Sequence, residues 1–135
     1  MKKKIIYTLF CLLLIPALSV AQTVARMTEK PVNAVQWINT HFARGAVPPF
    51  SFEYGSRHSS TFITQWKYRV DNLSSDNPRV IKRLYTYFDN ATGLQVTCEV
   101  TAFTDYRAVE WVLHFCNTGQ QNTPEIANVK VSDVT

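Results

Sequence analysis

Apolar and polar residues alternate along most of the chain from Phe50 onward. Phe50, Phe52 and Tyr54 occupy every second position, with Ser51 and Glu53 between them. A period of two is typical of strands that bury one face. The same alternation predicts five further strands, at residues 62–70, 80–88, 94–103, 108–117 and 125–134. Six strands joined by polar loops favour an all-β fold, an antiparallel β-sandwich.

The segment before these strands follows a helical period instead. Its apolar positions at that spacing are Val35, Ile38 and Phe42. Pro31 suits the first turn of a helix, and Gly45 is typical of a helix end. The prolines at positions 48 and 49 cannot continue a helix. We therefore expect one short helix within residues 28–45, ahead of the sandwich.

Two of the predicted strands form a hairpin whose register follows from its apolar pattern. The apolar positions are even-numbered in residues 94–103 and odd-numbered in residues 108–117. Both sets face the same side only if the numbers of paired residues sum to an odd value. A four-residue loop at 104–107 meets this condition. It predicts the pairs Val96–Phe115, Cys98–Leu113 and Val100–Trp111, with all six side chains buried.

The same register places the two cysteines of the hairpin on opposite faces. Cys98 faces the core, whereas Cys116 faces away from it. Thiols on opposite faces of adjacent strands cannot reach disulfide geometry without distortion. We therefore expect two free thiols, although a bulge in either strand would reverse the parity and permit a bridge.

Residues 1–21 have the pattern of a signal peptide. Lys2, Lys3 and Lys4 precede an apolar run, and Ser19 and Ala21 supply the small residues that cleavage before Gln22 requires. The apolar run is short for a membrane span. We expect export to the periplasm or the extracellular space, with no membrane contact after cleavage.

Cleavage changes both the length and the charge of what remains. Residues 22–48 form a polar lead with the short helix, and residues 49–135 are long enough for one sandwich domain. The formal net charge of +4 for the whole chain comes mostly from the three lysines of the signal. Because no basic cluster remains, nucleic acid is not an expected partner.

Candidate catalytic and metal-binding residues are sparse. Glu99 and Glu110 lie on the outward face of the hairpin. A pair of carboxylates there would serve acid–base catalysis, but single charges on an exposed strand face more often serve solubility. The three histidines, His41, His58 and His114, lack the spacing of metal ligands. We expect no catalytic residue, no metal site and no cofactor in this domain.

Aromatic residues make up 13% of the chain, which is many for a small domain. Exposed aromatic rings stack on sugars, whereas aromatic residues in strands more often fill a core. We favour the core interpretation for most of these residues and leave it most open for Trp66.

Five short segments follow one another along residues 48–119. They are PPFSF at 48–52, Trp66–Lys67 after a Ser-Ser loop, TGL at 92–94, AVEW at 108–111 and NTG at 117–119. Their order and spacing resemble the N-terminal β-sandwich domain of bacterial α-galactosidases of glycoside hydrolase family 36. The resemblance covers nearly all of residues 22–135. Cys116 departs from it, since a polar residue is expected at that strand end.

The resemblance implies a role for the domain. Members of the family cleave terminal α-galactosides by a retaining mechanism, with two aspartates on a (β/α)8 barrel downstream of the sandwich. The sandwich contributes scaffold and subunit contacts, which leaves a homo-oligomer open, and in some members a loop that helps to close the sugar pocket. By this resemblance Arg57, His58 and Trp66 are the candidate carbohydrate contacts.

We therefore expect an exported sandwich domain, or a fragment, of an α-galactosidase-like glycoside hydrolase. The sequence ends at Thr135, before a barrel of about 250 residues could begin. An α-galactoside or another carbohydrate would then be bound through that missing barrel. The alternative is a stand-alone secreted carbohydrate-binding or adhesion module. The strand pattern at residues 125–134 has no closing turn, which favours the larger enzyme.

Overall fold

A computed structural model describes residues 33–134, which form seven strands, one α-helix and two 3-10 turns. In chain order the elements are α1 (Ala34–His41), β1 (Ser51–Tyr54), β2 (Arg57–His58), η1 (Ser59–Thr61), η2 (Ile63–Gln65), β3 (Lys67–Leu73), β4 (Val80–Phe88), β5 (Leu94–Phe103), β6 (Ala108–Asn117) and β7 (Ile126–Lys130). The predicted signal peptide, residues 1–21, and the predicted helix start at Pro31 lie outside the described residues.

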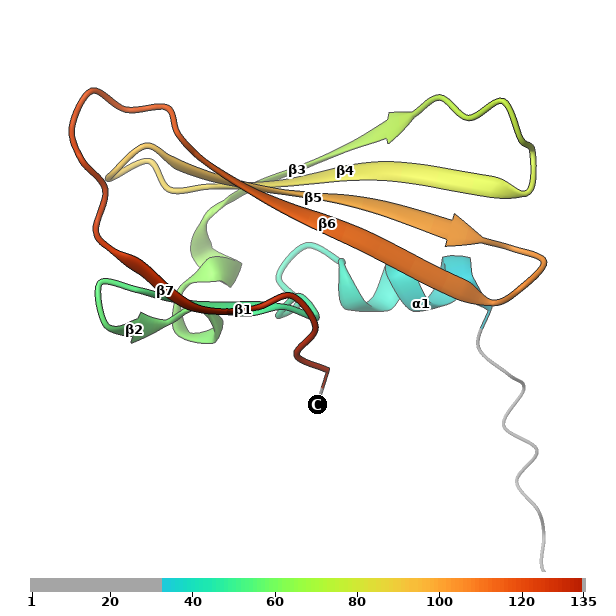
Figure 1. Ribbon diagram of the computed structural model, residues 1–135, viewed down its shortest axis with the longest axis horizontal. Helices are drawn as coiled ribbons and strands as arrows, with labels where there is room; N and C mark the ends of the chain where they lie inside the picture. Colours follow the sequence, from blue (N-terminus) through green and yellow to red (C-terminus); the bar gives the residue numbers. More distant parts are fainter. Residues whose placement is uncertain (1–32, 135) are drawn as a thin grey trace, which may run out of the picture.

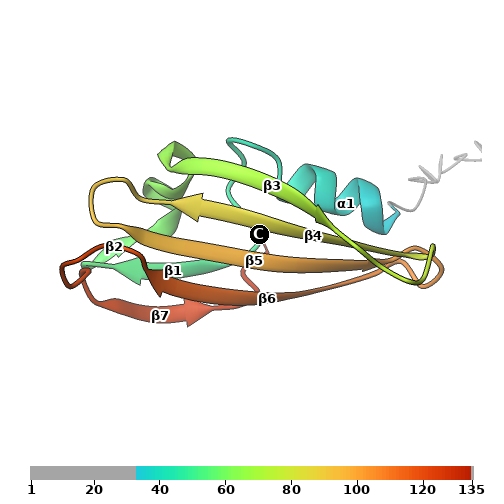
Figure 2. The same ribbon diagram turned by 90° about the horizontal axis from the view of Figure 1, so that it is seen from above.

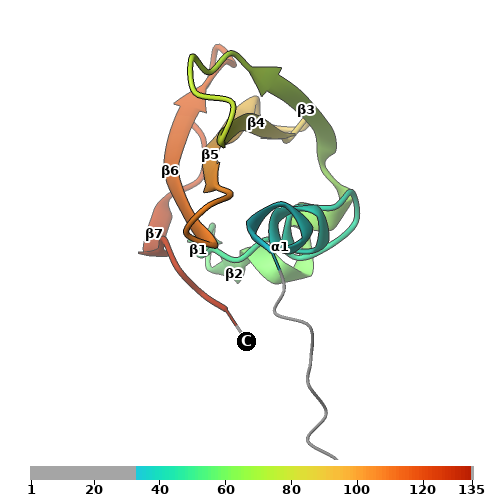
Figure 3. The same ribbon diagram turned by 90° about the vertical axis from the view of Figure 1, so that its right-hand side faces the viewer.

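The strands form two antiparallel sheets that share one core. The larger sheet has the order β3-β4-β5-β6, and the smaller has the order β2-β1-β7. Helix α1 and the smaller sheet lie side by side beneath the larger sheet, which arches over both (Figures 1 and 3). Seen from above, β7 of the smaller sheet and β6 of the larger sheet lie at the same edge of the molecule (Figure 2). The predicted all-β sandwich with one short helix is confirmed.

Helix α1 is shorter than the predicted helical segment. The Asn33 side chain caps its N-terminus by accepting a hydrogen bond from the amide of Gln36 at 2.7 Å. The chain leaves the helix at Phe42 and turns through Gly45, whose φ is +82°. Within residues 33–134, no helix is long and apolar enough to cross a membrane.

One face of α1 is buried against the larger sheet. Its buried positions are Ala34, Ile38 and Phe42. Val35, predicted on this face, is only half-buried because Ala34 takes the inward position. Trp37 extends the apolar contact, since its ring stacks on Trp111 of β6 with 5.6 Å between centroids.

Residues 62–66 do not form a strand, so this part of the predicted strand at 62–70 is wrong. The turn η1 ends just before this segment, η2 lies within it, and β3 begins only at Lys67. The amide of Phe62 donates to the Ser59 carbonyl at 3.1 Å, as a 3-10 turn requires. Phe62 and Ile63 are both buried. Adjacent residues of a strand point to opposite faces of the sheet, so a strand that buries one face could not bury both side chains. Burial of this pair overrides the alternating pattern.

The β5–β6 hairpin has the predicted register. The predicted pairs Val96–Phe115, Cys98–Leu113 and Val100–Trp111 are all present. The three residues on β5 are fully buried, but the three on β6 are only half-buried. The prediction of full burial is therefore wrong for β6, because β6 is the outermost strand of its sheet and has a neighbour on one side only.

The two cysteines are free, as the register predicted. Cys98 is buried and Cys116 is exposed. The turn between β4 and β5 closes at Gly93, whose φ is +83°.

Candidate functional site

Two of the three predicted carbohydrate contacts, Arg57 and Trp66, line one cleft of about 350 Å³. The cleft lies where the β1–β2 turn, the η2 segment and the β4–β5 turn meet. Its other lining residues include Tyr54, Phe62, Asp89, Thr92 and Pro124. Residues that are distant in the sequence thus build one site at one end of the sandwich.

Aromatic rings form one wall of this cleft. The centroid of the Trp66 ring lies 5.1 Å from that of Phe62 and 5.9 Å from that of Tyr54. Phe62 and Trp66 flank the η2 turn, which brings their rings to the same side. The guanidinium of Arg57 lies 5.4 Å from the Phe62 centroid, within cation–π range. The aromatic wall therefore carries an exposed cation at its rim.

A chain of hydrogen bonds forms a second wall. The Tyr54 hydroxyl donates to Thr92 Oγ1 at 2.7 Å, and the Thr92 hydroxyl donates to Asp89 Oδ2 at 2.7 Å. Asp89 Oδ1 accepts from the amide of Ala91 at 3.0 Å. These bonds fix the carboxylate in place, and its remaining lone pairs can still accept hydrogen bonds from a ligand.

Sequence reasoning missed the residues of this second wall. Asp89 and Thr92 lie at residues 89–93, between the predicted strands 80–88 and 94–103. An Asp whose carboxylate accepts from the amide two residues on is a recurrent turn feature. That local pattern was visible in the sequence, but the approach of Tyr54 to Thr92 was not.

His58, the third predicted contact, lies apart from this cleft. Arg57 and His58 are successive residues of β2, so their side chains project to opposite faces. His58 lines a separate cleft of about 430 Å³ together with Glu53 and Lys130. Its Nδ1 lies 2.7 Å from the Ser60 hydroxyl. The structure groups Arg57 with Trp66 and leaves His58 outside the group.

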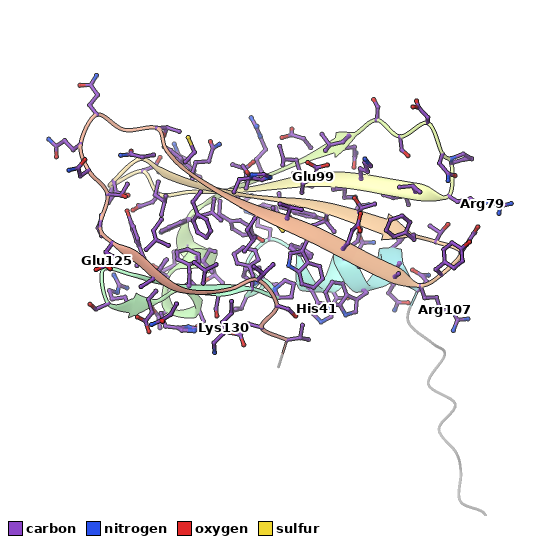
Figure 4. The ribbon with its side chains drawn as sticks, in the orientation of Figure 1. His41, Arg79, Glu99, Arg107, Glu125 and Lys130 are labelled. Atoms are coloured by element: carbon purple, nitrogen blue, oxygen red, sulfur yellow. The ribbon has the colours of Figure 1, made fainter. Side chains whose placement is uncertain are left out.

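The two carboxylates considered for catalysis lie on the outer face of the larger sheet. Glu99 is opposite Val112, and Glu110 is opposite Thr101, so they sit diagonally instead of facing each other. Figure 4 shows Glu99 on the side of the sheet away from α1. An open sheet face has no walls to exclude water or to orient a sugar ring. Among residues 33–134, no group of three His, Cys, Asp or Glu side chains could hold a metal ion.

A second cleft, of about 480 Å³, adjoins the first and shares Ala91 and Thr92 with it. It forms where the β4–β5 turn meets the segment after β6. The Gly93 carbonyl accepts from the Thr118 amide at 2.9 Å and from the Thr118 hydroxyl at 2.8 Å. Its rim carries four amide side chains, those of Asn90, Gln120, Gln121 and Asn122.

The adjoining clefts together offer aromatic faces, a guanidinium, a carboxylate, hydroxyls and amides. This set can stack on a ring and exchange hydrogen bonds with hydroxyl groups. The chemistry of these residues is the basis for a functional proposal. A scan against protein-family models finds no match for this chain, and searches of curated proteins and of solved structures find none either.

Proposed function

We propose that this chain is a noncatalytic β-sandwich domain of an exported α-galactosidase-like glycoside hydrolase. In this role it supports a catalytic barrel and contacts the carbohydrate through the cleft between Arg57, Trp66 and Asp89. The barrel would supply the two carboxyl groups that retaining hydrolysis needs.

The observation that carries the proposal is the contact between two of the segments that resemble this family. The TGL segment at 92–94 closes the β4–β5 turn, and the NTG segment at 117–119 follows β6. They are joined by the hydrogen bonds from Thr118 to the Gly93 carbonyl. Thr92 lines both clefts at this end of the sandwich. These two segments thus lie beside the candidate sugar contacts.

The composition of the cleft supports contact with a sugar. A pyranose ring has an apolar C–H face and a rim of hydroxyl groups. Trp66 offers a ring for the former, and Arg57 and Asp89 offer a donor and an acceptor for the latter. Its volume of about 350 Å³ is near the lower end of the range for ligand sites, about 300–1,000 Å³.

The proposal predicts weak binding without turnover. Purified protein should not hydrolyse a nitrophenyl α-galactoside. A galactose titration followed by NMR should give a dissociation constant of about 1 mM or weaker, because one aromatic platform leaves little surplus after the cost of association. Trp66→Ala should abolish the shifts. Tyr106→Ala is the control, since Tyr106 is 81% exposed and lies outside the cleft.

Three other outcomes would change the assignment. Hydrolysis that disappears in Glu99→Gln or Glu110→Gln would make the outer sheet face an active site and overturn the proposal. If the resonance shifts caused by galactose persist unchanged in Trp66→Ala, this cleft does not contact the sugar. Saturable binding in the micromolar range, without turnover, would favour the second candidate function, a stand-alone secreted carbohydrate-binding or adhesion module. The aromatic wall and the hydrogen-bonded carboxylate of the cleft are the features that would suit such a module.

A further inference from the structure

A basic pocket lies over the β3 edge of the larger sheet and shares one lining residue, Phe88, with the second cleft described above. It has a volume of about 440 Å³. Three cationic side chains line it, those of Arg44, Lys67 and Arg69. Arg44 comes from the loop after α1, whereas the other two alternate along β3. Two segments therefore bring like charges to one place.

This concentration of positive charge stands out against a neutral background. The whole chain has 14 Lys and Arg and 10 Asp and Glu, of which five cations and one carboxylate precede residue 33, so nine of each remain in the described part. Three of those nine cations line the pocket, and none of the nine carboxylates does. Asp71 pairs with Arg69 Nε at 2.9 Å and compensates one charge. Arg44 and Lys67 have no carboxylate partner in the described part of the chain.

A buried hydroxyl without a partner forms part of the pocket floor. Thr86 points to the outer face of β4, because it alternates with the inward-facing Tyr85 and Tyr87. Thr86 is 7% exposed as a residue, and its Oγ1 has no hydrogen-bond partner among residues 33–134. Such a group is unfavourable unless something bonds to it. Arg69 lies opposite Thr86 on β3, and its side chain is 70% exposed, so it can change orientation beside the hydroxyl.

From this arrangement we propose that the pocket is an oxyanion-binding site, which takes the carboxylate, sulfate or phosphate group of an acidic ligand. The anion accepts hydrogen bonds from Arg44, Lys67 and the Thr86 hydroxyl, and Arg69 turns from Asp71 toward it. Charge-assisted bonds of this kind are stronger than those between neutral groups. Phe88 adds an apolar wall for the remainder of the ligand.

The Thr86 hydroxyl distinguishes an anion-binding site from a simpler role for the charged residues of β3. Edge strands often carry charged residues that prevent pairing with another sheet, and β3 is an edge strand. That protective role requires the charges of Lys67 and Arg69 but not the Thr86 hydroxyl. A variant that removes only the hydroxyl therefore tests the binding site specifically.

The experiment titrates purified protein with sodium sulfate at constant ionic strength and follows the amide resonances by NMR. Thr86→Val should weaken sulfate binding by about tenfold, as loss of a hydrogen bond to a charged group does, while the melting temperature stays equal or rises. Arg44→Gln, in an exposed loop, should weaken binding without loss of structure. Lys82→Gln is the matched control, because Lys82 lies on the outer face of β4 but outside the pocket.

Parallel titrations with acetate, phosphate and galactose 6-sulfate distinguish the source of the oxyanion, with neutral galactose as reference. A stronger response to the sulfated sugar than to free sulfate would show that the Phe88 wall contributes. Two results would overturn the proposal. One is the absence of saturable shifts with every oxyanion. The other is binding that Lys82→Gln weakens as much as Arg44→Gln and that Thr86→Val leaves unchanged, which would mean diffuse attraction to surface charge.

Discussion

Gly93 packs against Gly119 so closely that a Cβ atom on Gly93 would lie 2.7 Å from the Gly119 backbone nitrogen. Gly93 also has a φ of +83°, a conformation that residues with a side chain rarely adopt. Two separate constraints therefore meet at one residue. They act where the β4–β5 turn touches the segment after β6, beside both clefts of the candidate site.

Gly93→Ala should destabilise the protein by about 3 kcal/mol, from backbone strain and from the clash with the Gly119 backbone. Gly45→Ala is the matched control. Gly45 has nearly the same φ, +82°, but nothing lies within 4 Å of its added Cβ. It should cost only about 1 kcal/mol. Urea unfolding measures both changes, and equal losses would contradict a packing constraint at Gly93.

Trp111 joins three parts of the fold. Its ring stacks on Trp37, and its indole N–H donates to the Val131 carbonyl at 2.6 Å, just after β7. Trp111→Ala should cost about 3 kcal/mol, at the low end for aromatic residues because the ring is half-buried. Trp111→Phe should cost about 1 kcal/mol, since it keeps a ring and loses the hydrogen bond. If both variants melt like the parent, the contact of β6 with the C-terminal segment does not support the fold.

Tyr87 and Tyr68 provide a paired test of the core. The Tyr87 hydroxyl is buried and has no hydrogen-bond partner in residues 33–134. The Tyr68 hydroxyl donates to the Phe42 carbonyl at 2.6 Å. Tyr87→Phe should therefore leave stability unchanged or raise it by about 1 kcal/mol, whereas Tyr68→Phe should lower it by about 1 kcal/mol. A loss in Tyr87→Phe, measured by urea unfolding, would show that its hydroxyl is satisfied in solution.

The two thiols of the hairpin should differ in reactivity. Cys116 is exposed and Cys98 is buried. Burial raises the pKa of the Cys98 thiol to about 12, so almost no thiolate is present near neutral pH. Of these two thiols, brief alkylation of native protein should label only Cys116, and alkylation in urea should label both, as read by peptide mapping. Recovery of a Cys98–Cys116 disulfide from native protein would contradict the register.

Stability should fall in alkaline solution. Desolvation raises the pKa of Cys98 from its ordinary value of 9.0 to about 12, and it also raises the pKa of Tyr87. For Cys98 the stabilising effect is complete below pH 9.0 and is lost as the pH rises toward 12, because the unfolded chain releases its proton first. The slope from one such group is about 1.4 kcal/mol per pH unit.

Cys98→Ala isolates this contribution. The variant loses some packing at every pH, so the comparison rests on slopes and not on absolute stabilities. Its unfolding free energy between pH 9.0 and 11 should fall less steeply than that of the parent, by about 1.4 kcal/mol per pH unit. Cys116→Ala is the control and should keep the parental slope. Parallel pH curves for the parent and Cys98→Ala would contradict the burial of the thiol.

The alternation of residue types was sufficient for most of the larger sheet. Strands β4, β5 and β6 have the bounds that the sequence predicted. A strand with one buried face has apolar residues at every second position, and this alternation is visible in the sequence. The parity of the apolar positions also determined that Val100 lies opposite Trp111. Pairing within a hairpin involves residues close along the chain, so its turn and its pattern define the register together.

Tertiary packing determined the features that the alternation of apolar and polar residues does not predict. Phe62 and Ile63 fit a strand by residue type, yet their joint burial under the core requires 3-10 turns. The 3-10 turns place Trp66 in the same cleft as Arg57. Likewise the bond from Tyr54 to Thr92 joins residues 38 positions apart. Such contacts arise only when two sheets pack face to face, and their energy depends on three-dimensional proximity that no local period of the sequence records.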